Sequence, residues 1–400
     1  MLEIFDENNN SLNYAEERNK VHEQGLWHRH VSAWIMNYNG DILLQRRSLT
    51  KKKNPGLWSK TGGHVEYKEE PLQAIKREIF EEIGLEVNNY ECIDLFQNDK
   101  EKEKYFSYGY IVYTNLKEHE FVLQQEEVDS VKYFTIEELE ANKDNPQFTF
   151  SKWDNEGFNK QMSLLKRFRD VLLNNNYNIT LDSLFEKLSN SEEIKNIYNK
   201  IEIREKNGGG YAYHNCEHVL NVMDIATKLL MKLDYDYKTI LKIKIACLLH
   251  DIGALEGKDN HADRSYEYAL NLFKDNNWIF EDSDKILDAI KNHSNGFDTD
   301  NILTLVIVLA DKLDIKKTRI SELGKTIEGN RQYGHIEDIL IDIQDNSLII
   351  NFITDKQLNI KEFNDYYFTK KVYKAINSFA QKFTLDVNLM IDDKDIKMVL

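Results

Sequence analysis

Three glutamates near residue 80 have the type and spacing to bind a divalent metal. Glu78, Glu81 and Glu82 occupy positions i, i+3 and i+4 of the segment PLQAIKREIFEEI. At this spacing three carboxylates share one face of a helix, where like charges repel each other unless a cation lies between them. Oxygen ligands of this kind suit Mg²⁺ or Mn²⁺. A solvated acidic helix face is the alternative interpretation of such a cluster.

Histidines and aspartates in the second half of the chain form another candidate metal site. His250 and Asp251 end the apolar run IKIACLL, and Asp311 ends the run ILTLVIVLA. A buried imidazole or carboxylate behind such a run is costly unless it is paired or bound to metal. Mixed imidazole and carboxylate ligands suit Fe, Mn, Zn or Co better than Ca²⁺. Taken singly, each histidine is more often a satisfied core residue. The other candidates in this half are His214, His218, His261 and His293.

The residues around the glutamates indicate the element that presents them. Pro71 fits the first turn of a helix, where a missing N–H costs nothing, and Gly84 is typical of a helix end. Gly62-Gly63 predicts a tight turn before the helix. Arg77 can pair with Glu69 at the helix entrance. We therefore expect a glycine turn followed by a helix over 70–83.

Composition limits the classes of function. The chain has 400 residues, with 52 Lys and Arg against 68 Asp and Glu, which gives a formal charge of −16. We expect no stable nucleic-acid binding, because such binding depends on basic surface that releases counterions from phosphates. Three scattered cysteines without a CxxC pair favour a reducing compartment and argue against a thiolate zinc site.

The sequence also predicts a cytoplasmic protein that does not bind membranes. Its first residues, MLEIFDENNN, lack the basic and apolar regions of a secretory signal. The longest strongly apolar run covers residues 302–310, about half of the ~20 residues that a membrane span needs. The oligomeric state stays open, a homo-oligomer included.

Changes in composition along the chain predict several domains. Short apolar runs (VSAWIM, DILLQ and YFSYGYIVY) surround the glutamate helix between residues 31 and 113, which is typical of an α/β/α fold. Helical spacing dominates after residue 134, with the polar stretch 174–178 as the candidate linker. Asp345-Asn346 predicts a β-hairpin turn in the tail. We expect domains over 1–145 and 179–400 with a helical connector over 146–178, the hairpin extension starting at about residue 330.

The first half resembles the Nudix hydrolases. The spacing from Gly63 through Glu69, Arg77-Glu78 and Glu81-Glu82 to Gly84 matches their signature position by position. The resemblance implies hydrolysis of a nucleoside diphosphate linked to another moiety, with Mg²⁺ or Mn²⁺ held by the three glutamates. It also implies that the Gly62 carbonyl adds a ligand and that Glu126 or Glu127 adds a ligand or a base. Candidate substrate-binding residues are Arg46, Arg47, Trp58 and Arg77, with Lys51–Lys53 completing a cationic loop that is alternatively only solvated.

Within that family, the segment GLWHRHVSAWIM resembles the branch that contains isopentenyl diphosphate isomerase. Those isomerases require a cysteine just before the histidine of the segment that corresponds to Gly62-Gly63-His64, where this chain has no thiol. Protonation of an alkene needs such an acid, so hydrolysis is favoured over isomerisation. His28 and His64 fall where the isomerases hold a second metal, with an ordinary hydrogen-bonded role as the alternative.

The second half resembles the HD-domain phosphohydrolases. His218, His250, Asp251 and Asp311 fill their H…HD…D pattern, and His261 and His293 match the further histidines of the subgroup that binds two metals. This resemblance implies an all-helical domain with one or two divalent transition metals (Fe, Mn, Co or Zn). It makes His214 the candidate proton donor and Asp251 a catalytic residue, and it offers Lys312 as a phosphate-binding residue.

Together the two patterns predict a bifunctional metal-dependent phosphohydrolase. One half would act on a linked nucleoside diphosphate, and the other on a nucleotide phosphoester, including a monophosphate released by the first. The expected partners are small-molecule nucleotides. The alternatives are a nucleotide-sensing protein in which one half binds without turnover, and an isomerase-like enzyme.

Overall fold

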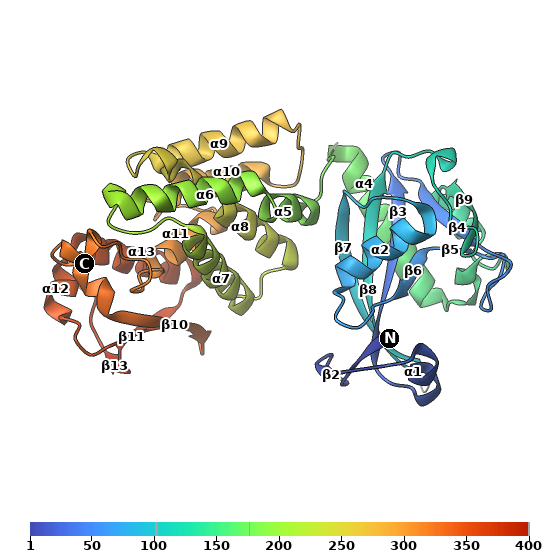
Figure 1. Cartoon of the computed structure of the whole chain (residues 1–400), viewed down its shortest axis with the longest axis horizontal. Coiled ribbons are helices and arrows are strands. Elements are labelled where there is room, and N and C mark those ends of the chain that lie inside the picture. Colours follow the sequence, from blue (N-terminus) through green and yellow to red (C-terminus); the bar gives the residue numbers. More distant parts are fainter. Residues whose placement is uncertain (101–102, 176, 399–400) are drawn as a thin grey trace. The chain divides into compact units, whose positions relative to one another are not determined.

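The computed structural model describes residues 1–100, 103–175 and 177–398, in two compact units, Met1–Ser183 (unit 1) and Leu184–Leu400 (unit 2). Helix α4 (Asn155–Asn175) ends inside the predicted linker 174–178. Residue 176 of that linker lies outside the described residues. Figure 1 shows the elements of each unit.

A seven-stranded mixed sheet forms the centre of unit 1 (Figure 1). Its main path is β5 (Trp58–Ser59), β4 (Ile42–Arg47), β3 (His28–Asn37), β8 (Glu103–Thr114) and β7 (Tyr90–Lys100). In addition, β6 (Thr61–His64) pairs with β3, and β9 (Val128–Phe134) pairs with β4. Strands β3 and β8 run parallel over ten residue pairs, from His28↔Tyr105 to Asn37↔Thr114. The predicted strands are confirmed as β3, β4 and β8, and β5, β7 and β9 are additions.

Alternation along β3 explains the α/β/α layering. Val31, Ala33 and Ile35 lie in one apolar cluster with residues of α2 (Pro71–Ile83). Trp34 and Met36 lie in a second cluster with residues of α3 (Ile136–Ala141) and α4. Because successive side chains of a strand point to opposite faces, one continuous apolar strand serves both layers. The predicted fold class of this half is confirmed.

Strand β6 contains the two glycines for which the sequence predicted a tight turn. That prediction is wrong: Gly62 and Gly63 pair with Ser32 and Val31 of β3 as extended strand residues. Both positions need glycine for space instead. A Cβ on Gly62 would lie 2.5 Å from the Val31 carbonyl oxygen. A Cβ on Gly63 would lie 2.1 Å from the Glu78 carboxyl group.

A small N-terminal layer extends unit 1 beyond the predicted elements. Strands β1 (Leu2–Phe5) and β2 (Ser11–Glu16) form an antiparallel pair, followed by α1 (Arg18–Gln24). The apolar side chains of this layer are buried in a separate cluster that contains Leu2, Ile4 and Val21. This layer carries His22 on α1.

Helices dominate unit 2, as the sequence predicted. The helical spacing expected after residue 134 continues here in α5 (Leu181–Ser189) and α6 (Glu192–Arg204). They are followed by α7 (Cys216–Lys232), α8 (Tyr237–Leu249), α9 (His261–Asp275), α10 (Ser283–Asn292) and α11 (Ile302–Leu313). All residues of α11 from Leu303 onward are buried, which explains its uninterrupted apolar sequence.

The tail after α11 holds more than the predicted hairpin. Strands β10 (Ile336–Gln344) and β11 (Ser347–Thr354) form that hairpin, with Asp345 and Asn346 both at positive φ in its turn. Helices α12 (Ile360–Asp365) and α13 (Tyr367–Phe383) follow. Strand β12 (Asp386–Ile391) then returns parallel to β11, and β13 (Lys394–Asp395) closes the four-stranded sheet. A parallel return needs a crossover connection, which α12 and α13 supply.

Within the described ranges, we find no helix with the length and apolar character that crossing a membrane requires.

Candidate metal centres

Helix α2 presents the three glutamates of unit 1 as predicted. The helix begins at Pro71 after the N-cap Glu70, and it ends at Gly84 in the left-handed conformation. Glu82 is 6% exposed, while the Glu81 side chain is 53% exposed. The carboxylates therefore lie on one side of the helix but at different depths.

Arg77 holds the acidic groups around the start of α2. Its Nε and Nη2 atoms donate to both carboxylate oxygens of Glu69, at 2.8 and 2.9 Å, as the sequence predicted. Its Nη1 atom donates to Glu78 at 3.0 Å and to Glu81 at 3.2 Å. Its Nη2 atom also donates to the carbonyl of His64, which ties α2 to β6. These bonds raise the pKa of Arg77, so its charge is permanent.

Glu82 lies deepest among the three glutamates. It accepts a hydrogen bond of 2.7 Å from Gln45 on β4. Burial raises the pKa of Glu82 to about 7 against that hydrogen bond, and the nearby carboxylate of Glu78 adds repulsion. Burial also raises the pKa of Glu78, opposed by Arg77. A buried acid with a raised pKa is stabilised in its charged form when a cation binds beside it.

The glutamates do not converge on one point in this structure. Among the described residues, the groups whose ligand atoms all lie within 4.8 Å of one another do not include Glu78, Glu81 and Glu82 together. Arg77 bonds to two of these carboxylates, and Gln45 bonds to the third. Binding of a metal to all three would therefore require the side chains to turn away from these partners.

The other residues predicted for unit 1 lie around the same strands. The Nε atoms of Arg46 and Arg47 donate to the carbonyls of Gly56 and Lys53, which closes the cationic loop after β4. Trp58 packs edge-on against Phe134 in the second apolar cluster. Glu127 pairs with Lys51.

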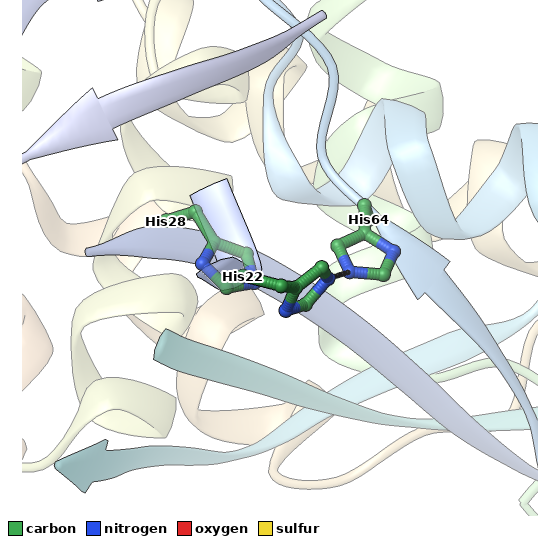
Figure 2. Close-up of side chains that lie close together, drawn as sticks. All are labelled: His22, His28 and His64. Atoms are coloured by element: carbon green, nitrogen blue, oxygen red, sulfur yellow. Dashed lines mark hydrogen bonds between the residues drawn. The ribbon is translucent and has the colours of Figure 1, made fainter. Parts of the chain in front are cut away.

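A second group of potential ligands in unit 1 consists of imidazoles (Figure 2). The ligand atoms of His22, His28 and His64 lie within 4.8 Å of one another. The Nε2 atoms of His22 and His64 are 3.1 Å apart, and Nδ1 of His28 donates to the Leu26 carbonyl. Burial lowers the pKa of His64 to about 2 and also lowers those of His22 and His28. Three neutral nitrogen atoms suit a transition metal better than Mg²⁺.

Sequence patterns pointed to two of these three histidines. His22 was missed because α1 reaches β3 and β6 only through the N-terminal layer, which has no motif. Its one sequence signal is its proximity to His28 and His30 along the chain.

The histidines and aspartates of unit 2 converge around Asp251. Its Oδ2 atom lies 3.1 Å from His218 Nε2 and 3.2 Å from His250 Nε2. Its Oδ1 atom lies 3.2 Å from His261 Nε2 and 3.3 Å from His293 Nε2. Asp311 joins the first set, with Oδ1 at 3.3 Å from His218 Nε2. Two groups of ligand atoms, each within 4.8 Å, thus share one carboxylate.

Each of the four imidazoles is oriented through its other nitrogen atom. Nδ1 of His218 donates to Asp314 Oδ2 at 2.7 Å. In the other three, Nδ1 donates to a backbone carbonyl: His250 to Cys247 (2.8 Å), His261 to Lys258 (2.7 Å) and His293 to Ile290 (2.7 Å). Because a carbonyl can only accept, Nδ1 carries the proton in the last three, and Nε2 of a neutral ring presents a lone pair. This arrangement is typical of histidines that ligate metal.

Three of the converging atoms have no hydrogen-bond partner, whereas Ser294 Oγ lies 3.2 Å from His293 Nε2 and Arg319 donates to Asp311 Oδ1. His218 Nε2, His250 Nε2 and Asp251 Oδ2 are buried without a hydrogen bond. His261 Nε2 and His293 Nε2 lie 2.9 Å apart. Unsatisfied buried polar atoms are rare and costly, and a cation between them would satisfy all of these at once. The donor set therefore fits divalent metal ions.

Electrostatics around Asp251 favour a positive charge. Although burial opposes ionisation, the neighbouring histidines hold the pKa of Asp251 well below its usual range. Lys312 and His218 likewise hold the pKa of Asp311 well below its usual range, against the effect of burial. Against the cost of burial, Asp251, Asp311 and Asp314 raise the pKa of His218 to about 10. A site that attracts a proton this strongly also attracts a metal ion.

A cavity of about 650 Å³ opens onto these ligands. His214, the predicted proton donor, lines it, and Glu205 fixes that residue by accepting from both its backbone N–H and its Nδ1, at 2.7 Å each. Lys312 also lines the cavity, but its Nζ atom is paired with Asp311 at 2.6 Å. No sequence pattern pointed to Glu205, which lies in an irregular turn before the YHN segment.

Comparisons with known proteins agree with this division. The family model of the NUDIX domain matches residues 26–153, and that of the HD domain matches residues 215–316. The chain therefore carries a Nudix domain in unit 1 and an HD domain in unit 2. Both types are typically hydrolase domains.

Individual relatives match unit 1. An isopentenyl-diphosphate Delta-isomerase from Serratia proteamaculans is 33% identical over 122 residues, 30% of this chain and 62% of the relative. Isopentenyl-diphosphate Delta-isomerase 2 from Aromatoleum aromaticum is 29% identical over 38% of this chain and 80% of its own length. Nudix hydrolase 3 from Arabidopsis thaliana is 30% identical over 37% of this chain and 21% of its own length.

Solved structures match the same unit. The MutT protein from Methanosarcina mazei Go1 is 20% identical, covering 35% of this chain and 95% of that chain at a TM-score of 0.29. Among the relatives compared by sequence, the chain spans less than two thirds of the length of the Serratia isomerase.

Proposed function

We propose that the chain is a metal-dependent phosphohydrolase with two active sites. The Nudix site hydrolyses a nucleoside diphosphate linked to another moiety, and the HD site hydrolyses a nucleotide phosphoester. The observation that carries the proposal is the convergence of four imidazoles and the Asp311 carboxylate around Asp251, with three buried ligand atoms (His218 Nε2, His250 Nε2 and Asp251 Oδ2) unsatisfied. The proposed partners are small nucleotides, with no nucleic acid and no membrane, and a homo-oligomer is compatible with the proposal.

The HD residues divide the work of hydrolysis. Divalent ions held by the two ligand groups would supply an activated water and neutralise phosphate oxygens. Asp251 positions both groups because each of its oxygens faces one pair of histidines. As the water oxygen bonds to phosphorus, the bond to the leaving oxygen breaks, and His214 in its imidazolium form gives that oxygen the proton on Nε2, while Nδ1–H stays bonded to Glu205. Glu205 holds the imidazole of His214 in place for this transfer.

In the Nudix site, the chain supplies the carboxylates and their scaffold. Glu78, Glu81 and Glu82 would hold Mg²⁺ or Mn²⁺, and the cation would favour the ionised form of Glu82. Arg77 keeps α2 against the loop that contains Glu69 and against β6. The basic residues after β4, Arg46 and Arg47, would attract the phosphates of the substrate.

A panel of nucleotides and linked nucleoside diphosphates tests the proposal. Release of phosphate and of monophosphate is measured with Mg²⁺, Mn²⁺ or a chelator. Glu81→Gln/Glu82→Gln should abolish cleavage of linked diphosphates only, and His250→Ala/Asp251→Ala should abolish phosphoester hydrolysis only. Glu86→Gln and His335→Ala, outside both sites, are the matched controls. If neither double variant changes any product, both assignments are wrong.

Isomerisation is the second candidate function, because relatives of the Nudix domain are named isopentenyl-diphosphate isomerases. The histidine cluster of Figure 2 also supports it. Against it, the β6 segment Thr61–His64 contains no thiol to protonate an alkene. We expect no isomer to form from isopentenyl diphosphate, as measured by product chromatography with the full chain. Turnover that His64→Ala abolishes and Glu81→Gln/Glu82→Gln spares would favour the isomerase instead.

A nucleotide-sensing role, in which one half binds without turnover, is the remaining alternative. In the same panel of nucleotides, this role predicts that one site binds a nucleotide but forms no product from it. The presence of every ligand position in both motifs favours turnover over sensing.

A further inference from the structure

The tail of unit 2 forms one wall of the HD cavity. Tyr366, Tyr367, Phe368 and Lys371 line the cavity together with the ligand Asp251. These residues belong to the start of α13, which contacts α11 (Figure 1). They lie outside the HD match of residues 215–316. The tail therefore contributes to the site and is not a separate appendage.

Three lysines gather at this wall, and they differ in their partners. Lys312 is 4% exposed, and Asp311 neutralises it. Lys258 and Lys371 also line the cavity, and neither has an ion-pair partner among the described residues. Two unpaired ammonium groups beside a third are unfavourable without an anion.

The lysines lie close enough to influence one another. Partial burial lowers the pKa of Lys371, with Lys312 and Lys374 adding to the effect. An anion placed among these groups would offset this repulsion.

The ring of Phe368 lies beside two of these lysines. The Nζ atoms of Lys258 and Lys312 lie 5.8 and 5.7 Å from the centre of its ring, so the ring holds both cations at the wall. Helix α13 begins here at Tyr367, and no side chain caps its first N–H groups. The free N–H groups at the start of a helix add further attraction for an anion.

The lysines of this wall lie close to the candidate metal ligands of the HD domain. Lys312 contacts Asp311, which faces His218 at 3.3 Å, so the lysine wall and the HD ligands are neighbours through one pair. A cavity of about 650 Å³ has the size of a small-molecule site, whereas a nucleic-acid strand needs an open groove. The size of the cavity and its lysines fit a small anion that carries charge at two places.

We propose that Lys258 and Lys371, which line the cavity together with Phe368, form a subsite for a second phosphate group, so that the HD site acts on nucleotides with at least two linked phosphates. The inference rests on the proposed phosphohydrolase function. The water oxygen attacks the phosphorus beside Asp251, the phosphoester bond from that phosphorus to the nucleoside oxygen breaks, this oxygen takes the proton from His214, and the linked phosphates leave together. The lysines bind the phosphate linked to the one attacked. A monophosphate released by the Nudix site would not fill this subsite.

The test compares mono- and diphosphates of adenosine and guanosine in full-length protein loaded with Mn²⁺. Glu81→Gln/Glu82→Gln is the common background, so that only the HD site turns over. Lys371→Ala should lower kcat/KM for the diphosphates about tenfold, the loss expected for one charge-assisted contact. Lys258→Ala/Lys371→Ala should lower it about a hundredfold. The monophosphates should change less than about twofold, because they do not reach the subsite.

Lys370→Ala is the matched control, since Lys370 is the exposed neighbour of Lys371 and does not line the cavity. Lys371→Gln keeps the length of the side chain and separates loss of charge from loss of packing. Thermal unfolding of each variant shows whether the fold survives. A loss that is equal for mono- and diphosphates would overturn the subsite.

Binding provides a readout that is independent of turnover. The dissociation constant of an α,β-methylene nucleoside diphosphate, measured by calorimetry, should rise about tenfold in Lys371→Ala and stay unchanged in Lys370→Ala. If His250→Ala/Asp251→Ala abolishes turnover but the lysine variants change neither binding nor the diphosphate preference, the subsite is wrong and the proposed function stands. If the HD site turns over no nucleotide while the lysine variants still weaken binding, the proposed function fails and the subsite stands.

Discussion

The two candidate metal centres hold their ligand side chains in different ways. In the HD domain, hydrogen bonds on Nδ1 orient all four imidazoles, and the ligand atoms already converge. In the Nudix domain, Arg77 and Gln45 bond to the glutamates, which point to different partners. A chain can thus prepare a site for a metal either by fixing its ligands or by giving them temporary partners. The HD centre should therefore hold metal tightly, and the Nudix centre should exchange it easily.

The largest effect should come from Asp251→Asn, because this carboxylate serves both ligand groups. We expect HD turnover to fall about a thousandfold and the metal that copurifies with the chain to be lost. Metal analysis and phosphate release measure this, with Asp284→Asn on α10 as the control. Nudix turnover should not change. Full retention of metal by Asp251→Asn would contradict the shared-ligand arrangement.

Gly63→Ala should be next, and it should act on the Nudix centre alone. The new Cβ would lie 2.1 Å from the Glu78 carboxyl group, so this side chain must move. A displacement of about 1 Å at a reacting centre can cost about a hundredfold in rate. The readout is cleavage of a linked nucleoside diphosphate, compared with Gly334→Ala, where a Cβ meets open space. Equal losses at both centres would indicate unfolding instead.

Asp314→Asn tests whether the preparation of the HD centre matters. This carboxylate accepts from Nδ1 of His218, and loss of such support costs roughly 10–100-fold in metal affinity or activity. Asp355→Asn is the control, since Asp355 pairs with His335 at 3.0 Å outside the cavity. Metal titration of the stripped protein measures the affinity. An unchanged affinity would mean that the ligands are not held in place by their second partners.

Gln45→Met should have the smallest effect. It removes the hydrogen bond to Glu82 and the one that Thr61 donates to Gln45, each worth about 1 kcal/mol or less at a site that must rearrange. We expect no more than about a threefold change in the Mg²⁺ dependence of Nudix turnover. Gln147→Met, on the exposed surface, controls for the added apolar group. A change as large as that of Asp314→Asn would remove the contrast between the centres.

Local sequence signals predicted much of both centres. Pro71 and Gly84 delimited α2, and the apolar runs before His250 and Asp311 predicted buried helices, because these features depend on neighbours in the chain. The tight turn at Gly62-Gly63 was a wrong prediction, since crowding from β3 and Glu78 explains these glycines as well as a turn does.

Residues that act across long sequence distances were out of reach. His22 joins His64 from 42 residues away, and Lys371 joins the HD cavity from the far side of the hairpin. No spacing rule links such pairs, because the connecting segments can take many lengths. Glu205 was hidden for a different reason, since an irregular turn has no periodicity to mark a buried acid.

Asp251 gives one oxygen to each group of histidines, so the two positions cannot fill independently. The first cation to arrive neutralises the charge that the second would meet, and it also draws the carboxylate toward itself. Loading should then be stepwise, with a strong and a weak equivalent, although each position has its own pair of rings. Metal supply would thereby set how much of the enzyme is competent, with half-loaded molecules as the resting population when metal is scarce.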